Sequence, residues 1–188
     1  MPSRRFVLGL APAAVLAACA SPNPVLYTLA PVPGTPRAGG PRVVELRTIG
    51  LPRYLDRTQI VRSSENYQLD VMANNWWGEP LGAMMGRILV SELSQRLPDS
   101  SVYSDAGAIS SDPDAIVEIN IQRFDADSAG NLILTAQFAV RWSAPKRPGV
   151  TRPFSASVPA SLTDLPTLVS AMSTAMGQLA DAIAGALI

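Results

Sequence analysis

Residues 117–142 read VEINIQRFDADSAGNLILTAQFAVRW, and this stretch decides the fold class. Apolar and polar side chains alternate in both halves, which is the pattern of a strand with one buried face. The turn-forming residues 125–131 between the halves predict an antiparallel hairpin. Residues 154–158 repeat the alternation after a second turn, so we expect three antiparallel strands. The positions expected to share the buried face are Val117, Ile119, Ile121, Leu132, Leu134, Ala136, Phe138, Val140 and Trp142.

Two helices are expected to cover this apolar face. Residues 81–97 carry apolar side chains every four residues, after Pro80 and before Pro98, which are typical start and stop signals. The last helix is expected to start near Asp164 and to run to the C-terminus, with an apolar seam at four-three spacing.

Shorter strands are predicted on the N-terminal side of the first helix. They cover residues 43–51, 59–62 and 67–72, and the last two flank a hairpin turn at residues 63–66. The predicted fold class is therefore α+β, with two layers in which an antiparallel sheet is covered by two helices.

The first 18 residues have the pattern of a secretory signal peptide. Arg4 and Arg5 precede an apolar run, and small residues lead into Cys19, which resembles the bacterial lipobox. An ordinary signal peptide with a chance cysteine is the alternative, but the sequence offers this single thiol no disulfide or metal partner. We therefore expect Cys19 to be lipidated as the first mature residue. Ala20 follows it instead of aspartate, which favours the outer membrane.

Residues 19–41 are predicted to be a lipidated, flexible tether, because proline and glycine dominate them. The stretch Tyr27 to Leu29 interrupts the proline pattern with strand-forming residues and could dock on the edge of the domain. The folded domain is expected to span residues 42–188.

Composition argues against most enzyme classes. The chain contains no histidine, one cysteine and one lysine, Lys146, so sites built on Ser-His-Asp, Cys-His or histidine-ligated zinc are unavailable. We expect no catalytic residues, metal or cofactor. Removing Arg4 and Arg5 with the signal leaves thirteen basic residues against fifteen acidic ones and no basic stripe, so nucleic acid is not an expected partner.

Four motifs resemble one protein family. They are Tyr27-Thr28-Leu29, residues 51–57 (LPRYLDR) leading into Gln59-Ile60-Val61, Trp77-Gly-Glu-Pro-Leu81, and Arg123-Phe124-Asp125. In this order they are similar to the ABC-type transport auxiliary lipoproteins, the PqiC-like components of MCE (mammalian-cell-entry) lipid transport systems. Gly78 stands where the family more often has alanine.

The resemblance implies a non-enzymatic envelope lipoprotein. It would assist an MCE-type ABC system that moves phospholipid between the inner and outer membranes, and would dock onto the periplasmic MCE subunit. A lipid-binding carrier is the alternative, because four methionines would suit an adaptable apolar cavity; they also fit ordinary core packing. These methionines are Met84, Met85, Met172 and Met176.

Three residues around the tryptophan and tyrosine motifs are candidates for partner contact. Trp77 is expected to be buried in the core at the start of the first helix. Trp76 is expected to point in another direction and is the better candidate for an exposed contact. Tyr54 and Leu55 either pack beside the core or form an apolar tip offered to a partner.

The last helix also suggests self-association. Between residues 168 and 188 Asp181 is its only charge, and small residues line its expected outer face, including Ser173 and Gln178. Such a face permits close approach by a second copy, or it simply faces water. The first helix, in contrast, carries Arg87, Glu92 and Arg96, as solvated helices do.

Overall fold

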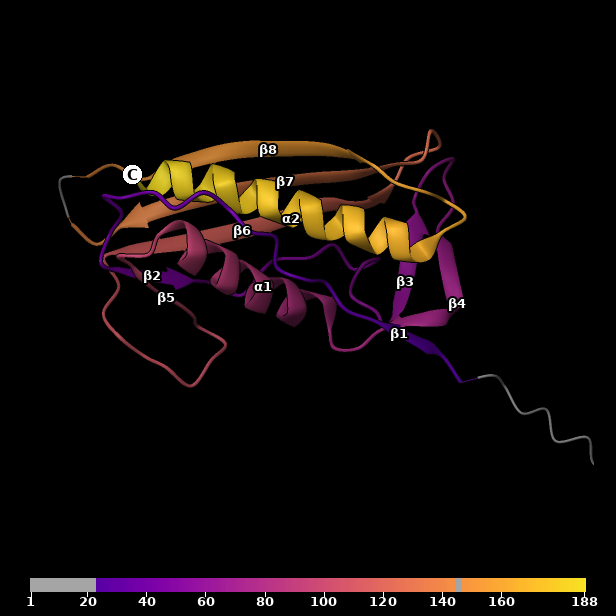
Figure 1. The fold of residues 1–188 in the computed structure, drawn as a ribbon, viewed down its shortest axis with the longest axis horizontal. Helices are drawn as coiled ribbons and strands as arrows, with labels where there is room; N and C mark the ends of the chain where they lie inside the picture. Colours follow the sequence, from indigo (N-terminus) through magenta and orange to yellow (C-terminus); the bar gives the residue numbers. More distant parts are fainter. Residues whose placement is uncertain (1–22, 145–146) are drawn as a thin grey trace, which may run out of the picture.

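The structure is a computed structural model that describes residues 23–144 and 147–188. These residues form one sheet of eight strands with two helices on one of its faces (Figure 1). The elements are β1 (Val25–Tyr27), β2 (Val43–Leu46), β3 (Gln59–Ser63), β4 (Asp70–Trp77), α1 (Leu81–Arg96), β5 (Ser101–Ser104), β6 (Ala115–Ala126), β7 (Asn131–Trp142), β8 (Val150–Pro159) and α2 (Leu165–Leu187).

The predicted three-stranded core is confirmed. Strands β6, β7 and β8 pair antiparallel, and Ile119 lies opposite Phe138. Phe138 is 2% exposed, whereas its neighbour Gln137 faces solvent, so the predicted register of β7 is correct. Trp142, at the end of the same face, is half-buried under the guanidinium of Arg147.

The sheet is mixed rather than purely antiparallel, which corrects the predicted fold in this respect. One edge of β6 pairs with β7, and the other edge is shared by β2 at its start and β3 at its end, both parallel to β6. Strand β5 extends the sheet beyond β2, also in parallel. Parallel neighbours cannot be joined by a tight hairpin, and in the chain β3, β4 and α1 lie between the parallel neighbours β2 and β5.

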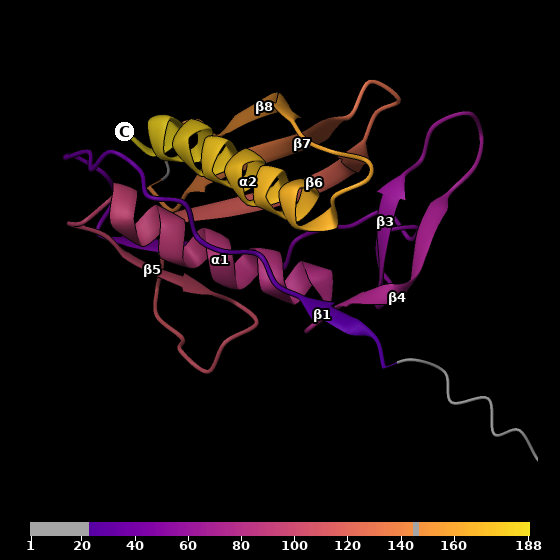
Figure 2. The ribbon, with the colours of Figure 1, turned by 45° about the vertical axis from the view of Figure 1, so that its right-hand side comes forward.

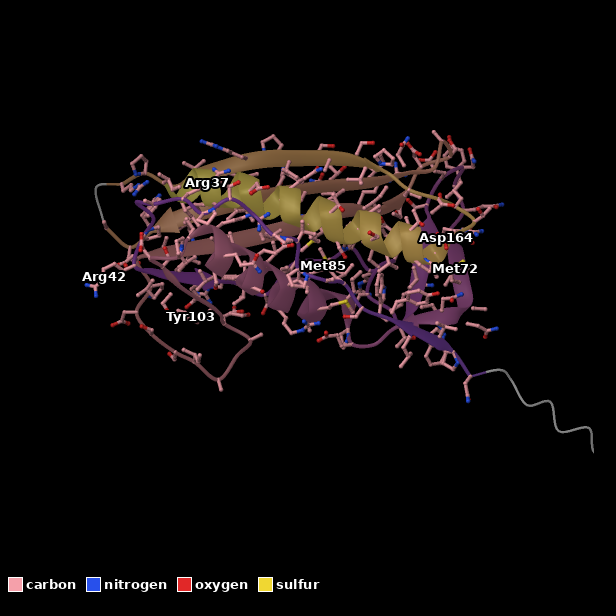
Figure 3. All side chains as sticks on the ribbon, in the orientation of Figure 1. Arg37, Arg42, Met72, Met85, Tyr103 and Asp164 are labelled. Carbon is pink, nitrogen blue, oxygen red and sulfur yellow. The ribbon has the colours of Figure 1, made fainter. Side chains whose placement is uncertain are left out.

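Both helices pack on the same face of the sheet, and α2 contacts β6, β7 and β8 (Figure 2). Their facing apolar side chains form one core, in which Met85 lies between α1 and the strands (Figure 3). The bounds of both helices agree with the sequence pattern to within one or two residues. Neither helix is long and apolar enough to cross a membrane.

The short strands at the periphery were harder to predict. Strand β5 was missed, since four residues give little periodicity. Strand β1 does dock on the sheet edge, in parallel with β4, although it covers residues 25–27 rather than 27–29. Strands β1, β4 and β3 form an arm at the end of the molecule where the described chain begins (Figure 1).

Candidate functional site

Residues 28–37, which we call the strap, run from β1 along both helices (Figure 2). Leu29 is 2% exposed, and its amide donates to Met84 Sδ of α1 at 3.1 Å. The amide of Ala30 donates to Ser173 Oγ of α2 at 3.1 Å. The strap therefore contacts both helices, although the sequence indicated a flexible segment up to residue 41.

The second half of the strap is held by two charged side chains of α1. The amide of Val32 donates to Glu92 Oε1 at 2.8 Å, and its carbonyl accepts a hydrogen bond from Arg96 at 3.2 Å. The amide of Arg37 donates to the Arg96 carbonyl oxygen at 2.7 Å, and Figure 3 places Arg37 beside the last turns of α2. Proline lacks the amide donor, so a strap rich in proline has few amides that need a partner, and four of these donate to groups of α1 and α2.

Arg96 links three segments of the chain although it is only 1% exposed. Its Nε donates to Asp181 Oδ1 of α2 at 2.7 Å, and its second terminal nitrogen donates to the Gly177 carbonyl at 3.0 Å. Together with the bond to Val32, these contacts join α1, α2 and the strap. A buried charge is tolerated when its hydrogen-bonding capacity is filled in this way.

Two glycines make room for this arrangement. A Cβ on Gly34 of the strap would lie 2.2 Å from Arg96 Cζ, and a Cβ on Gly177 of α2 would lie 3.0 Å from Val32 Cβ. The first distance is a direct overlap and the second is tighter than normal van der Waals contact. The close approach of strap and helices thus depends on the absence of side chains at both positions.

Glu92 is buried less favourably than Arg96. The side chain is fully buried, and its Oε2 accepts no hydrogen bond from the described residues. Burial raises the pKa of the Glu92 carboxyl to about 7, and nearby Asp181 adds to this, while the Val32 amide and Arg96 act in the opposite direction. The carboxyl therefore changes its charge close to neutral pH.

The structure changes the interpretation of three predicted contact residues. Leu55 is 2% exposed and belongs to the core. The hydroxyl of Tyr54 donates to the buried carboxylate of Asp125 at 2.8 Å; burial and this contact raise the pKa of Tyr54 to about 12. Ser173 lies beneath the strap and is 6% exposed, so it is not on an open face. For Leu55 and Tyr54 the sequence was compatible with either core packing or partner contact. For Ser173 it predicted a position on the outer face of the last helix, which is wrong.

The other two candidates remain accessible. Gln178 is exposed on α2, and Trp76 is half-buried on β4, where its indole N–H donates to the Ala73 carbonyl. Trp77 is 5% exposed, which confirms the prediction that it is buried in the core. Self-association through α2 stays a prediction, and it would have to use exposed positions such as Ser170 and Gln178.

A groove lies on the side of α1 away from the strap, and sequence reasoning missed it. It encloses about 530 Å³ between α1, the start of the β2–β3 loop and the β5–β6 loop. Its floor is made of small and apolar side chains, and a Cβ on Gly86 would meet no atom within 4 Å. The signal in the sequence is the pair Gly82 and Gly86, four residues apart on one helix. The main floor residues are Ile49, Leu51, Gly82, Ala83 and Gly86.

The two arginines that line the groove are both paired with acidic side chains. Arg47 pairs with Glu45 at 2.8 Å, and Arg87 pairs with Glu79. All four methionines that suggested a lipid cavity are buried in the core, none more than 1% exposed, and none lines this groove. Among the described residues, no three His, Cys, Asp or Glu side chains lie close enough together to hold a metal ion. Cys19 and the predicted signal peptide lie outside the described residues.

The fold places the chain in a known structural class. An uncharacterized protein of solved structure superposes with a TM-score of 0.72 at 19% identity, over 87% of this chain and 97% of that one. Protein XCC0632 from Xanthomonas campestris, of family DUF330, superposes with a TM-score of 0.66 at 20% identity, over 86% and 93% of the two chains. No curated protein sequence matches the chain.

The chain belongs to the family described as ABC-type transport auxiliary lipoprotein component, whose model matches residues 27–184. The resemblance noted from the four motifs is thereby confirmed. The description is that of a transport component and not of an enzyme family. The match begins at Tyr27, so it includes the strap as well as the sheet and helices.

Proposed function

We propose that this chain is a lipid-anchored, non-enzymatic subunit of an MCE-type ABC system that moves phospholipid between the inner and outer membranes. Its role would be to dock onto the periplasmic MCE subunit from the outer membrane. Membership of the auxiliary lipoprotein family over residues 27–184 is the observation that carries this proposal. The absence of histidine and the balanced charge of the chain are consistent with a binding role.

The groove beside α1 is the surface we propose for docking. It is open and has an apolar floor, and the glycines in that floor let a partner's side chains approach the helix backbone. Its arginines are already paired with acidic residues on its rim, which favours an apolar segment over a charged ligand. Trp76 lies outside this groove and remains a separate candidate contact.

Co-purification of the tagged chain with the MCE subunit of the same organism tests the docking role. Gly86→Arg should abolish the complex, because a Cβ at this position meets no atom within 4 Å and the long side chain would occupy the groove. Gln95→Arg is the matched control, since Gln95 is exposed on α1 outside the groove. A complex that survives Gly86→Arg would exclude this surface. Failure to recover any MCE subunit, with phospholipid bound to the isolated chain, would favour the carrier alternative.

The anchor is tested by labelling cells with a radioactive fatty acid. The chain should incorporate the label, and Cys19→Ser should prevent incorporation while the domain still folds, because the thiol has no disulfide partner. Mass spectrometry of the mature N-terminus should show an acylated Cys19. Cleavage at another residue, or a free thiol at Cys19, would contradict the lipid anchor.

A further inference from the structure

Four of the six large hydrophobic side chains that are exposed among the described residues lie at one end of the molecule; the other two are Ile109 on the β5–β6 loop and Ile188 at the C-terminus. Strand β1 carries Val25 and Leu26, which are 54% and 62% exposed. The β3–β4 hairpin carries Tyr67, which is fully exposed, and Leu69. Figure 1 shows β1 and the hairpin tip at the same end of the longest axis, at opposite ends of β4, because β1 pairs with residues 75–77 and the turn precedes Asp70. No helix or strand of the described chain covers these four side chains.

The hairpin holds Tyr67 in an unfavourable backbone conformation. Asn66 and Tyr67 have φ values of 55° and 61°, and the Gln68 amide closes the turn onto the Glu65 carbonyl. Turns of this type favour glycine at the second central position, because a side chain there costs energy. Nothing in the described structure packs on the tyrosine to offset this cost. An aromatic side chain presented in this way suits a contact outside the chain.

The length of chain between Cys19 and β1 limits which end of the domain can reach a membrane. Because the strap is held on the helices, the part of the chain that can separate Cys19 from the domain ends at β1 and not at residue 41. Six residues from Cys19 to Val25 span at most about 20 Å. Helix α2, which runs along the longest axis, has 23 residues and is roughly 35 Å long. The tether is therefore shorter than the domain.

We infer that the end of the molecule formed by β1 and the β3–β4 hairpin lies on the membrane that holds the lipid anchor, with Val25, Leu26, Tyr67 and Leu69 in the headgroup region. This inference rests on the lipid anchor of the proposed function. Tyrosine is favoured at membrane interfaces because it has an apolar ring and a polar hydroxyl. The opposite end, with the C-terminus, then points into the periplasm (Figure 1).

The contact is apolar rather than electrostatic. The β6–β7 turn and the start of α2 lie at the same end and bear Asp127 and Asp164, and Figure 3 shows Asp164 there. These acidic groups would not attract anionic lipid. The partner is accordingly the surface of a zwitterionic bilayer, and the association should depend little on salt.

Depth-dependent quenching tests this orientation. The lipidated full-length chain is reconstituted into phosphatidylcholine vesicles that carry nitroxide-labelled lipid, with a fluorophore on Tyr67→Cys or on Ile109→Cys. Acylated Cys19 does not react with the fluorophore. Ile109 is the matched control, because it is 68% exposed on the β5–β6 loop, away from the hairpin. The label at position 67 should be quenched several-fold more than the label at position 109, at low and high salt alike.

A second substitution separates contact from mere proximity. Leu26→Glu should reduce quenching of the label at position 67, because it places a charge in the proposed headgroup contact. Equal quenching at positions 67 and 109, in vesicles that carry the protein on flotation, would refute the orientation and leave the anchor intact. A chain that does not float with the vesicles would refute the anchor and the orientation together.

Discussion

The two sides of α1 that do not face the sheet differ in which residues they bury. On the side under the strap, Glu92 and Arg96 are buried, although both are charged. On the groove side, Gly82 and Ala83 remain accessible, although small residues are commonly found where helices pack closely. The chain therefore uses buried charges to hold its own N-terminal segment, whereas on the groove side the charges lie at the rim and a floor of small residues stays open.

The difference shows that residue type alone does not determine exposure on a helix. Position in the helical repeat was the better guide, because Met84, Ile88, Glu92 and Arg96 follow each other at four-residue spacing on one stripe. The first two are core residues, so the last two could have been expected to lie over the same buried line. Their burial became possible because the strap supplies backbone partners for both.

The largest effect is expected for Arg96→Ala. The substitution leaves the Asp181 carboxylate and the Val32 and Gly177 carbonyls without their donor, so the free energy of unfolding should fall by about 3 to 5 kcal/mol. Arg87→Ala is the control on the groove side, where the arginine is exposed and pairs with Glu79; it should cost at most about 1 kcal/mol. Urea denaturation of both variants measures the difference. Equal losses would mean that the strap-side charges do not hold the fold.

Because of Glu92, the free energy of unfolding should fall as pH rises from about 4.5 to about 7. The pKa of the Glu92 carboxyl is at its ordinary value of 4.5 in the unfolded chain, whereas burial raises this pKa to about 7 in the folded protein. Between these values the native state binds more protons, so unfolding becomes easier with rising pH, by on the order of 3 kcal/mol in total. The stability gap between Glu92→Gln and the natural chain should therefore grow from pH 4.5 to 7 in favour of the variant.

The control for this pH profile is Glu79→Gln, which removes an acidic group on the groove rim. The same pH series on this variant separates the effect of Glu92 from the general effect of losing one carboxylate on α1 or its N-terminal turn. A flat profile for Glu92→Gln would show that the carboxyl is already ionised in the folded protein at low pH. The conclusion that burial under the strap keeps the Glu92 carboxyl protonated would then be wrong.

Paired glycine substitutions give the smallest and most specific effects. Gly177→Ala should lower the melting temperature, because its Cβ would press on Val32 of the strap. Gly86→Ala should raise the melting temperature, because alanine favours the helix and the site is open. The gain in the free energy of unfolding should be up to about 1 kcal/mol. Thermal unfolding measures both signs. The comparison fails if the two substitutions change stability in the same direction.

The sequence predicted those features of the fold that are encoded in long periodic patterns. The strand alternation through Phe138 and the bounds of both helices follow from repeats of two and of nearly four residues. The parallel pairing of β2 with β5 and with β6 depends on contacts between distant segments, which no local pattern specifies. The same limit applies to the strap, because proline and glycine give no periodicity even where the backbone is bound.

The candidate site was predicted less well than the fold. Ser173 was singled out because small outer residues permit close approach, and close approach does occur, but by residues of the same chain. The groove could not be located because its walls come from α1 and from two loops far apart in the sequence. Only the family motifs, which fall on β1, the β2–β3 loop, α1 and β6, indicated a function from the sequence.

Amide hydrogen exchange at the strap tests the central claim most directly. If residues 28–37 are part of the folded domain, the amides of Val32 and Arg37 should be protected, because they donate to Glu92 and to the Arg96 carbonyl. Arg96→Ala should remove this protection before it affects the amides of β6 and β7. Exchange of Val32 and Arg37 in the natural chain at the rate of an unstructured peptide would contradict the account and restore a free tether up to residue 41.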